Sequence, residues 1–189
     1  MKIGVIVSTT RPNRVGRTIA EWFMEQVKDV KEAKFELIDL QEENLPFLDE
    51  PMSPSMGNYQ NEHTKNWGKK IAGYDGYVWV TAEYNHGYPA PLKNAIDTVY
   101  AEWAKKPVAF VGYGGLGGVR SIEQLAQVAV QLNMVPLAST GDVVTIVEVW
   151  SSIDEVGALK PEYIKGSPEK LTQSLLWWAK VLKPAREQQ

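Results

Sequence analysis

Short apolar runs alternate with segments of helical spacing along most of the chain, and this pattern predicts the secondary structure. β-Branched and aromatic runs typical of buried strands occur at residues 3–7, 35–38, 76–82, 108–111 and 135–138. Apolar residues at helical spacing predict helices at residues 15–29, 59–73, 91–104, 122–132 and 168–182. The fifth strand either continues or is interrupted near residues 143–147. Residues 40–58, rich in Pro, Gly, Asn and Ser, are expected to form a long loop.

The alternation of strands and helices indicates one doubly wound α/β domain. Alternating βα units bury a parallel sheet between two layers of helices, so we expect a five-stranded parallel sheet with helices on both faces. A chain of 189 residues suits one domain with a sizeable core, and we find no internal repeat or linker. We therefore expect a single domain over residues 1–189. Periodicity by itself does not give the order of the strands.

The composition argues against several classes of function. The formal net charge is −3, whereas a nucleic-acid-binding protein usually carries a basic excess. The chain has no cysteine, which excludes disulfides, thiol catalysis and cysteine-ligated metals, and His63 and His86 are too few for a multi-histidine metal site. No stretch approaches the roughly 20 apolar residues of a membrane span. We therefore expect a cytoplasmic protein with no metal site and no membrane or nucleic-acid partner.

The loop after the first strand favours an anion. It runs from residue 8 to residue 17 and contains Arg11, Arg14 and Arg17 with no acidic residue among them. The first N–H groups of a helix are unpaired, the helix dipole is positive there, and arginines add charge and bidentate hydrogen bonds. The alternative is an ordinary polar turn, capped by Ser, Thr or Asn, whose arginines are only solvated. The loop lacks the Gly-x-x-x-x-Gly-Lys pattern of nucleoside triphosphate sites, so a monophosphate suits it better.

The glycine-rich segment from Gly112 to Gly117 has two readings. It matches G-x-G-x-x-G between a strand and a helix, so a dinucleotide site of the Rossmann type is one hypothesis. That hypothesis needs an acidic residue at the end of the next strand, and the region of residues 134–140 offers none; Asp142 comes late. The other reading is a turn in which the chain passes close to its neighbours.

The loop after the third strand carries the most specific pattern, and it lies where open α/β sheets place their ligands. Residues 82–97 resemble the Pro-Glu-Tyr-Asn loop and the following Leu-Lys-Asn-Ala-(Ile/Leu)-Asp helix of the NADPH-dependent FMN reductase family, with Ala82 in place of the first proline. Residues 44–51 resemble the family's Asp-Leu-Pro-x-x-Asp-Glu-Pro segment. The loop after the first strand resembles its Gly-Ser-x-Arg loop, with Val7 in place of the glycine. The resemblance covers residue 3 to about residue 140. It implies a flavodoxin-like fold with strand order 2-1-3-4-5.

The resemblance also implies which residues bind the FMN cofactor. Its phosphate would be held by Ser8, Thr10, either Arg11 or Arg14, and the amides of Arg14, Val15 and Gly16. Its ring would lie against Glu83, Tyr84, Asn85 and His86, where we expect Glu83 to act mainly by bonding backbone amides. The pyrimidine edge would meet Tyr113, Gly114 and Gly115. We expect no catalytic side chain, because the flavin itself accepts the hydride.

The resemblance thus predicts an FMN-dependent NAD(P)H oxidoreductase. NADPH or NADH would be the donor, without a preference visible in the sequence. The acceptor would be a small molecule such as a quinone, an azo dye, a free flavin or a metal oxyanion. The family also implies a homodimer or a tetramer of dimers. The alternative is a flavodoxin-type electron carrier, against which the low net charge and residues 83–97 argue.

Overall fold

Strands and helices alternate as the apolar pattern predicts. The computed structural model describes residues 1–139 and 141–187. In this part of the chain the elements are, in order, β1 (Lys2–Val7), α1 (Gly16–Gln26), β2 (Lys34–Asp39), α2 (Leu40–Glu43), η1 (Pro54–Met56), α3 (Glu62–Ala72), β3 (Gly76–Ala82), α4 (Ala90–Asp97), η2 (Ala101–Trp103), β4 (Pro107–Tyr113), α5 (Val119–Gln131), β5 (Val135–Leu137), β6 (Val143–Ile146), η3 (Pro161–Tyr163), β7 (Ile164–Lys165) and α6 (Pro168–Glu187). None of the described helices has both the length and the hydropathy needed to cross a membrane.

The described strands form one seven-stranded sheet rather than the expected five-stranded one. The order β2-β1-β3-β4 confirms the flavodoxin-like arrangement. The expected fifth strand is interrupted: β5 pairs with the first half of β4, and β6 pairs with its second half, from Phe110 to Tyr113. The additional strand β7 lies antiparallel to β6. A two-residue strand is too short to produce a periodic signal, which is why the sequence does not predict it.

Two further elements differ from the expectation. The helix expected at 91–104 ends at Asp97 and is followed by the short η2 turn, although its apolar residues are buried as predicted. The segment expected to be a long loop begins with α2. The carboxylate of Asp39 caps this helix by accepting the N–H of Gln41 at 3.0 Å, and Asn44 ends it in the left-handed conformation at φ 45°.

The alternation of side chains along the central strands gives the two faces of the sheet different cores. Val78 and Val80 face the α1 and α6 layer, which is largely aliphatic. Large aromatic residues occupy the opposite face, under α3, α4 and α5. Trp103 lies 4.9 Å from Tyr77 and 6.0 Å from Trp79, both in edge-to-face contact. Such pairs contribute about 0.5–1.5 kcal/mol each beyond the burial of their surface.

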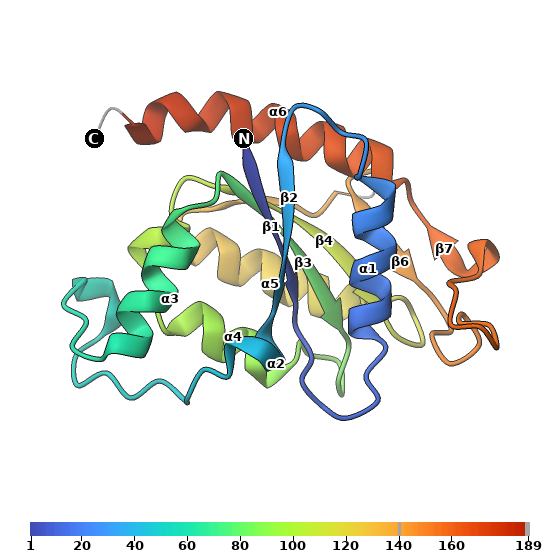
Figure 1. The fold of residues 1–189 in the computed structure, drawn as a ribbon, viewed down its shortest axis with the longest axis horizontal. Coiled ribbons are helices and arrows are strands. Elements are labelled where there is room, and N and C mark those ends of the chain that lie inside the picture. Colours follow the sequence, from blue (N-terminus) through green and yellow to red (C-terminus); the bar gives the residue numbers. More distant parts are fainter. Residues whose placement is uncertain (140, 188–189) are drawn as a thin grey trace.

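This architecture brings several loops to one edge of the sheet. The strands β1, β2, β3 and β4 are parallel, so their carboxyl ends meet on the same side. Figure 1 shows the turns that follow β1, β2 and β3 gathered along the lower side of the molecule, while α6 crosses the opposite side near the N-terminus. The loops in which the sequence predicts ligand-binding residues therefore lie together.

A buried lysine at the opposite end of the sheet should make stability depend on pH. Lys106 is 4 % exposed, and its Nζ donates to the carbonyls of Ile71 and Ala72 at 2.9 and 3.2 Å. Burial lowers the pKa of Lys106 to about 7, whereas the unfolded chain keeps a value near 10.4. Below pH 7 both states carry the proton. Above pH 7 the unfolded state binds more protons, so this group makes the free energy of unfolding rise with pH up to about 10.

The comparison of wild type with Lys106→Met isolates this effect. We expect the difference in unfolding free energy, wild type minus variant, to rise from pH 7 to pH 9 by at most about 1.4 kcal/mol per pH unit. Urea unfolding at pH 6, 7, 8 and 9 measures it. A difference that stays constant over this range would show that the ammonium group of Lys106 is not destabilised by burial.

Candidate functional site

The three arginines of the loop after β1 have different environments. Arg14 forms an ion pair with the carboxylate of Asp39, which is 2 % exposed at the end of β2. Arg17 pairs with the same carboxylate at 2.9 Å and with Glu21 and Glu42 at 2.7 and 2.8 Å. Arg11 is exposed, and its one hydrogen bond among the described residues is a long one of 3.4 Å to the carbonyl of Pro12. Arg11 is therefore the arginine whose charge is available to a ligand.

The same loop contains hydrogen-bond donors that the described part of the protein leaves unused. The hydroxyl of Ser8 and the Nε of Arg14 are buried without a partner. The N–H groups between Thr9 and Gly16 donate to no described atom, and α1 has neither a side-chain cap nor an acidic residue in its first turn. A buried unsatisfied donor costs about 1–3 kcal/mol. This many donors around a positive helix end fit a bound anion.

Gly16 allows α1 to begin against a buried hydroxyl pair. The hydroxyls of Thr9 and Tyr113 lie 3.1 Å apart, and burial raises the pKa of Tyr113 well above its ordinary value, so the phenol stays neutral. A Cβ at residue 16 would stand 2.4 Å from both oxygens. The glycine thus lets the first turn of the helix approach the end of β4.

The turn after β3 has an unusual backbone. Tyr84 and Gly87 exchange hydrogen bonds of 2.8 and 3.0 Å, and Asn85 and His86 both have positive φ values, of 51° and 69°. Two consecutive left-handed residues define a type I′ turn. The N–H groups of Asn85 and His86 donate to no described atom, while the side chain of Gln124 fixes the carbonyl of His86 at 2.9 Å. The turn holds two free amides in a fixed orientation.

Glu83 connects the loop after β3 to its neighbours, and the amide that its carboxylate binds lies in α5 rather than in its own turn. Its carboxylate accepts the backbone N–H of Arg120 at 3.1 Å and the guanidinium of Arg120 at 2.5 Å. Its own N–H donates to the carbonyl of Tyr113 at 3.0 Å. These bonds join the loop after β3 to the start of α5 and to the end of β4.

The glycines at the end of β4 and after it fall into two groups. A Cβ at Gly112 or Gly118 would lie 2.5 or 2.7 Å from backbone atoms, so these glycines are required by the close passage of the chain. A Cβ at Gly114 or Gly115 would meet protein atoms only at 3.4 Å or more. The fold therefore does not need glycine at 114 and 115. Both glycines line a cavity, and a Cβ there would touch Glu83 at residue 114 and the indole of Trp150 at residue 115.

These loops enclose a cavity of about 150 Å³. It is lined by Arg11, Arg14, Val15, Ala82, Glu83, Tyr84, Tyr113, Gly114, Gly115, Val149 and Trp150. Eight of the predicted site residues thus come together. Ser8 and Gly16 are buried nearby in the loop after β1 and in the first turn of α1, and Asn85 and His86 lie at the exposed tip of the turn after β3.

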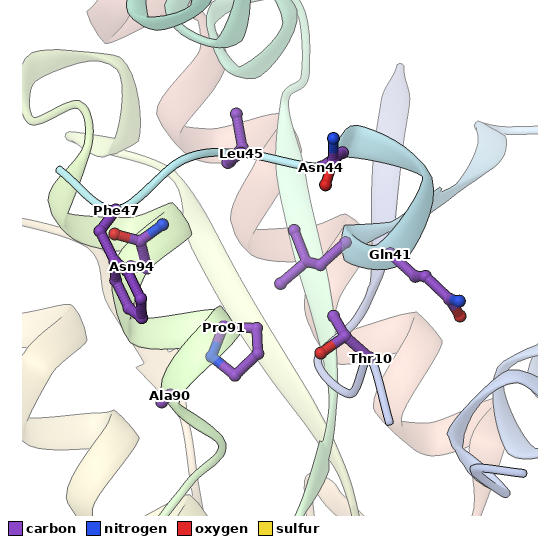
Figure 2. Close-up of a pocket in the computed structure, with 9 residues that line it drawn as sticks. Thr10, Gln41, Asn44, Leu45, Phe47, Ala90, Pro91 and Asn94 are labelled. Carbon is purple, nitrogen blue, oxygen red and sulfur yellow. The ribbon is translucent and has the colours of Figure 1, made fainter. Parts of the chain in front are cut away.

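Thr10 instead lines a second, larger cavity of about 360 Å³ between α2 and α4. In Figure 2 the side chain of Thr10 lies on one side of this space, and those of Pro91 and Asn94 lie on the other. Asn94 is fully used within the protein: its Oδ1 accepts the N–H of Leu48 at 2.9 Å, and its Nδ2 donates to the carbonyl of Pro46 at 2.7 Å. It fixes residues 46–48 along α4.

Ala82, Val149 and Trp150 line the first cavity and were not predicted. Ala82 lies in the resembled motif, where it replaces the first proline. Val149 and Trp150 lie beyond the resembled region, and a single exposed tryptophan after a strand has no pattern that would identify it. Among the described residues, no group of three or more His, Cys, Asp or Glu side chains is placed to hold a metal ion.

Comparison with known proteins is consistent with this geometry. The family model described as NADPH-dependent FMN reductase matches residues 1–145. The chain is 49 % identical over 135 residues to an NAD(P)H-dependent FMN reductase of Schizosaccharomyces pombe, covering 70 % of this chain and 68 % of that one. It is 32 % identical to an NAD(P)H-dependent FMN reductase of a Nectria species over 98 % of this chain and 99 % of the other. The solved structure of FerB, an NAD(P)H:acceptor oxidoreductase from Paracoccus denitrificans, covers 96 % of this chain and 94 % of its own with a TM-score of 0.65 at 20 % identity.

Proposed function

The chain belongs to the NADPH-dependent FMN reductase family, and we propose that its 150 Å³ cavity, with the loop after β1, is where it holds FMN for NAD(P)H-dependent oxidoreductase chemistry. The observation that carries this assignment is the set of unused donors around the first turn of α1. They match a terminal phosphate, and the backbone of Gly114 and Gly115 lines the cavity in which the ring would lie.

The loop after β1 would bind the phosphate. The Ser8 hydroxyl and the free N–H groups between Thr9 and Gly16 supply neutral donors, including those of Thr10 and Val15. Arg11 supplies a charge that no described acidic side chain neutralises. Arg14 remains a candidate through its unpaired Nε, although Asp39 already compensates its charge.

The loops after β3 and β4 would position the ring. The free amides of Asn85 and His86 and the side chain of Tyr84 would contact one part of it, and the backbone of Gly114 and Gly115 another. Glu83 and Tyr113 would act by holding these loops in place, through Arg120 and Thr9. Backbone N–H groups fixed before the reaction stabilise negative charge without reorganisation.

FMN supplies the redox chemistry when bound: it accepts a hydride from the nicotinamide and passes electrons to an acceptor. Among the residues that line the cavity, the carboxylate of Glu83 is bound by Arg120, and Tyr113 is a neutral phenol hydrogen-bonded to Thr9. We therefore propose that these residues only bind and orient, and that protons come from solvent. Small quinones and azo compounds are the acceptors we propose.

A spectroscopic experiment tests this function. The purified protein, or the apoprotein given FMN, should bind one FMN per chain in preference to FAD, because the loop provides for one terminal phosphate. Anaerobic addition of NADPH or NADH should then bleach the flavin absorption band without a partner enzyme. Excess quinone should restore the band. Heat release and chromatography identify the cofactor, and stopped-flow absorption follows the bleaching.

Two results would contradict the proposal. Failure of the apoprotein to take up FMN would remove the assigned site. Flavin that binds but stays oxidised with both nicotinamides would indicate an electron carrier instead of a reductase.

We propose that the protein associates as a dimer, or as a tetramer of dimers, through α4, α5 and the segment before α3. That segment exposes Phe47 and Met56, which are 81 % and 62 % exposed. Beside it, a groove of about 690 Å³ runs between α4 and α5, with Ile96, Tyr100 and Leu132 among its lining residues. Exposed apolar area of this kind is typical of subunit contacts.

Light scattering at micromolar concentration should therefore give at least twice the mass of the 21.2 kDa chain. Phe47→Asp should shift the distribution toward the monomer, because it places a charge in the proposed contact. Val156→Asp is the matched control, since Val156 is 88 % exposed outside this surface. A monomeric wild-type protein would refute the assignment.

A further inference from the structure

Trp150 is the most exposed tryptophan among those the structure describes, and it lies beside the cavity. Its side chain is 84 % exposed. The far end of its indole covers Gly115, since a Cβ there would be 3.4 and 3.5 Å from Cζ3 and Cη2 of the ring. Arg11 and Tyr84 line the same cavity from other loops. An exposed indole next to a cavity offers a large apolar surface to whatever occupies it.

The backbone that carries Trp150 is held firmly. In the turn of residues 148–152, the N–H of Ser151 donates to the carbonyl of Glu148 at 2.8 Å. Ser152 is completely buried, and its hydroxyl donates to the carbonyl of Val149 at 2.9 Å. The carbonyl of Ser152 in turn accepts the N–H of Lys160 at 2.8 Å. The exposure of Trp150 is therefore a property of a fixed turn and not of a loose loop.

The same turn fixes the orientation of the glycine backbone. The N–H groups of Glu148 and Val149 donate to the carbonyls of Gly115 and Gly114, at 3.1 and 3.3 Å. In a trans peptide the C=O and the following N–H point in opposite directions. The N–H groups of Gly115 and Leu116 are therefore directed away from these donors, and they donate to no described atom. The turn both supplies the indole and orients two free amides.

We propose that the 148–152 turn, which lies beyond the region matched by the family model, is part of the flavin site, with Trp150 packing against the bound FMN and Glu148 and Val149 positioning the amides of Gly115 and Leu116. This inference rests on the proposed FMN site. Trp150 is a binding residue that closes the cavity on the side of the loop after β4. Because the indole is exposed, its removal leaves the fold intact.

Equilibrium titration of apoprotein with FMN tests the proposal without using activity. Trp150→Ala should raise the dissociation constant roughly tenfold, because an aromatic contact with a planar ring is lost. Trp150→Phe should recover most of the affinity. Trp177→Ala is the matched control: Trp177 is 59 % exposed on α6, outside the cavity, and its replacement should leave the constant unchanged. The flavin band of the Trp150→Ala complex should also shift, since the environment of the ring becomes more polar.

The outcomes separate this inference from the proposed function. If wild type binds FMN and Trp150→Ala binds it within twofold of wild type, the inference fails while the function stands. If Trp150→Ala changes the oligomeric state in light scattering and not the affinity, the indole contacts a second copy of the chain, and the inference also fails. If wild type itself does not bind FMN, the proposed function and this inference fail together.

Discussion

Replacement of Arg11 by alanine should weaken FMN binding roughly tenfold to hundredfold. A charge-assisted hydrogen bond to a phosphate contributes about 1.5–3 kcal/mol, and Arg11 is the arginine of the loop that no described carboxylate neutralises. Its guanidinium is exposed at the edge of the cavity. The stability of the apoprotein should hardly change, because Arg11 is exposed and its one hydrogen bond among the described residues is the long one to Pro12.

Arg17→Ala is the matched control for this prediction. Arg17 is in the same loop region, but its guanidinium is shared among Asp39, Glu21 and Glu42. We expect its loss to change the dissociation constant less than about threefold, since it contributes no free charge to the site. Titration of the apoproteins with FMN, at fixed ionic strength, compares the two variants. Equal affinity of Arg11→Ala and wild type would move the phosphate to Arg14 or away from this loop.

Alanine at Gly118 and alanine at Gly115 should have opposite effects. Gly118 has φ 74°, and a Cβ there would stand 2.7 Å from the backbone nitrogen of Tyr113. We expect Gly118→Ala to cost roughly 2–4 kcal/mol in unfolding free energy, from the left-handed backbone and the overpacking together. Gly115→Ala meets only ordinary contacts, so its stability should stay within about 0.5 kcal/mol of wild type. Its FMN affinity should fall at least about tenfold, because the methyl group would press on the indole of Trp150 and alter the cavity wall.

Thermal and urea unfolding of the two apoproteins, followed by FMN titration, gives both quantities. The informative result is the contrast: one variant should lose stability, and the other should lose cofactor affinity. Unimpaired FMN binding by Gly115→Ala would mean that the ring does not approach this part of the backbone.

The sequence predicts most of the fold because the apolar positions that define the strands and helices are the positions whose side chains are buried in the structure. The bounds of β3 were predicted as observed, since Val78 and Trp79 belong to one continuous apolar run buried on both faces. The helix that begins near Pro91 was predicted too long. Its apolar spacing continues to Trp103, but this residue belongs to the short η2 turn and not to the helix. The indole N–H of Trp103 donates to the carbonyl of Ile96 at 3.1 Å, which holds the buried side chain in place. Periodicity reports which side chains are buried and does not fix where a helix ends.

The ion pairs of the arginine loop after β1 were not predicted from the sequence. The three arginines have no acidic neighbour in their own segment, yet Asp39 pairs with two of them. The signal existed: Asp39 ends β2, Val7 ends β1, and these residues are paired in register on neighbouring strands. Parallel strands end at the same edge of a sheet, so this contact follows once the strand order is known. The contact of Trp150 with Gly115 does not follow from strand order, because it depends on the path by which an irregular turn brings residue 150 back to the loop after β4.

The short strand β7 has a consequence for how copies of the protein can meet. An open sheet has two outer strands whose free backbone groups invite aggregation. At one edge, β7 pairs with β6 over only two residues. The chain then passes close to β6 at Gly166, where a Cβ would be 2.2 Å from the carbonyl oxygen of Val143. At the other edge, on β2 itself, the carboxylate of Glu36 binds Lys34 at 2.8 Å and Lys2 of β1 at 2.9 Å, which lowers the pKa of Glu36 to about 2 and keeps this edge charged even in acid. Neither edge presents a long, uncharged run of backbone, so sheet extension into fibrils is disfavoured and association is left to the helical surfaces.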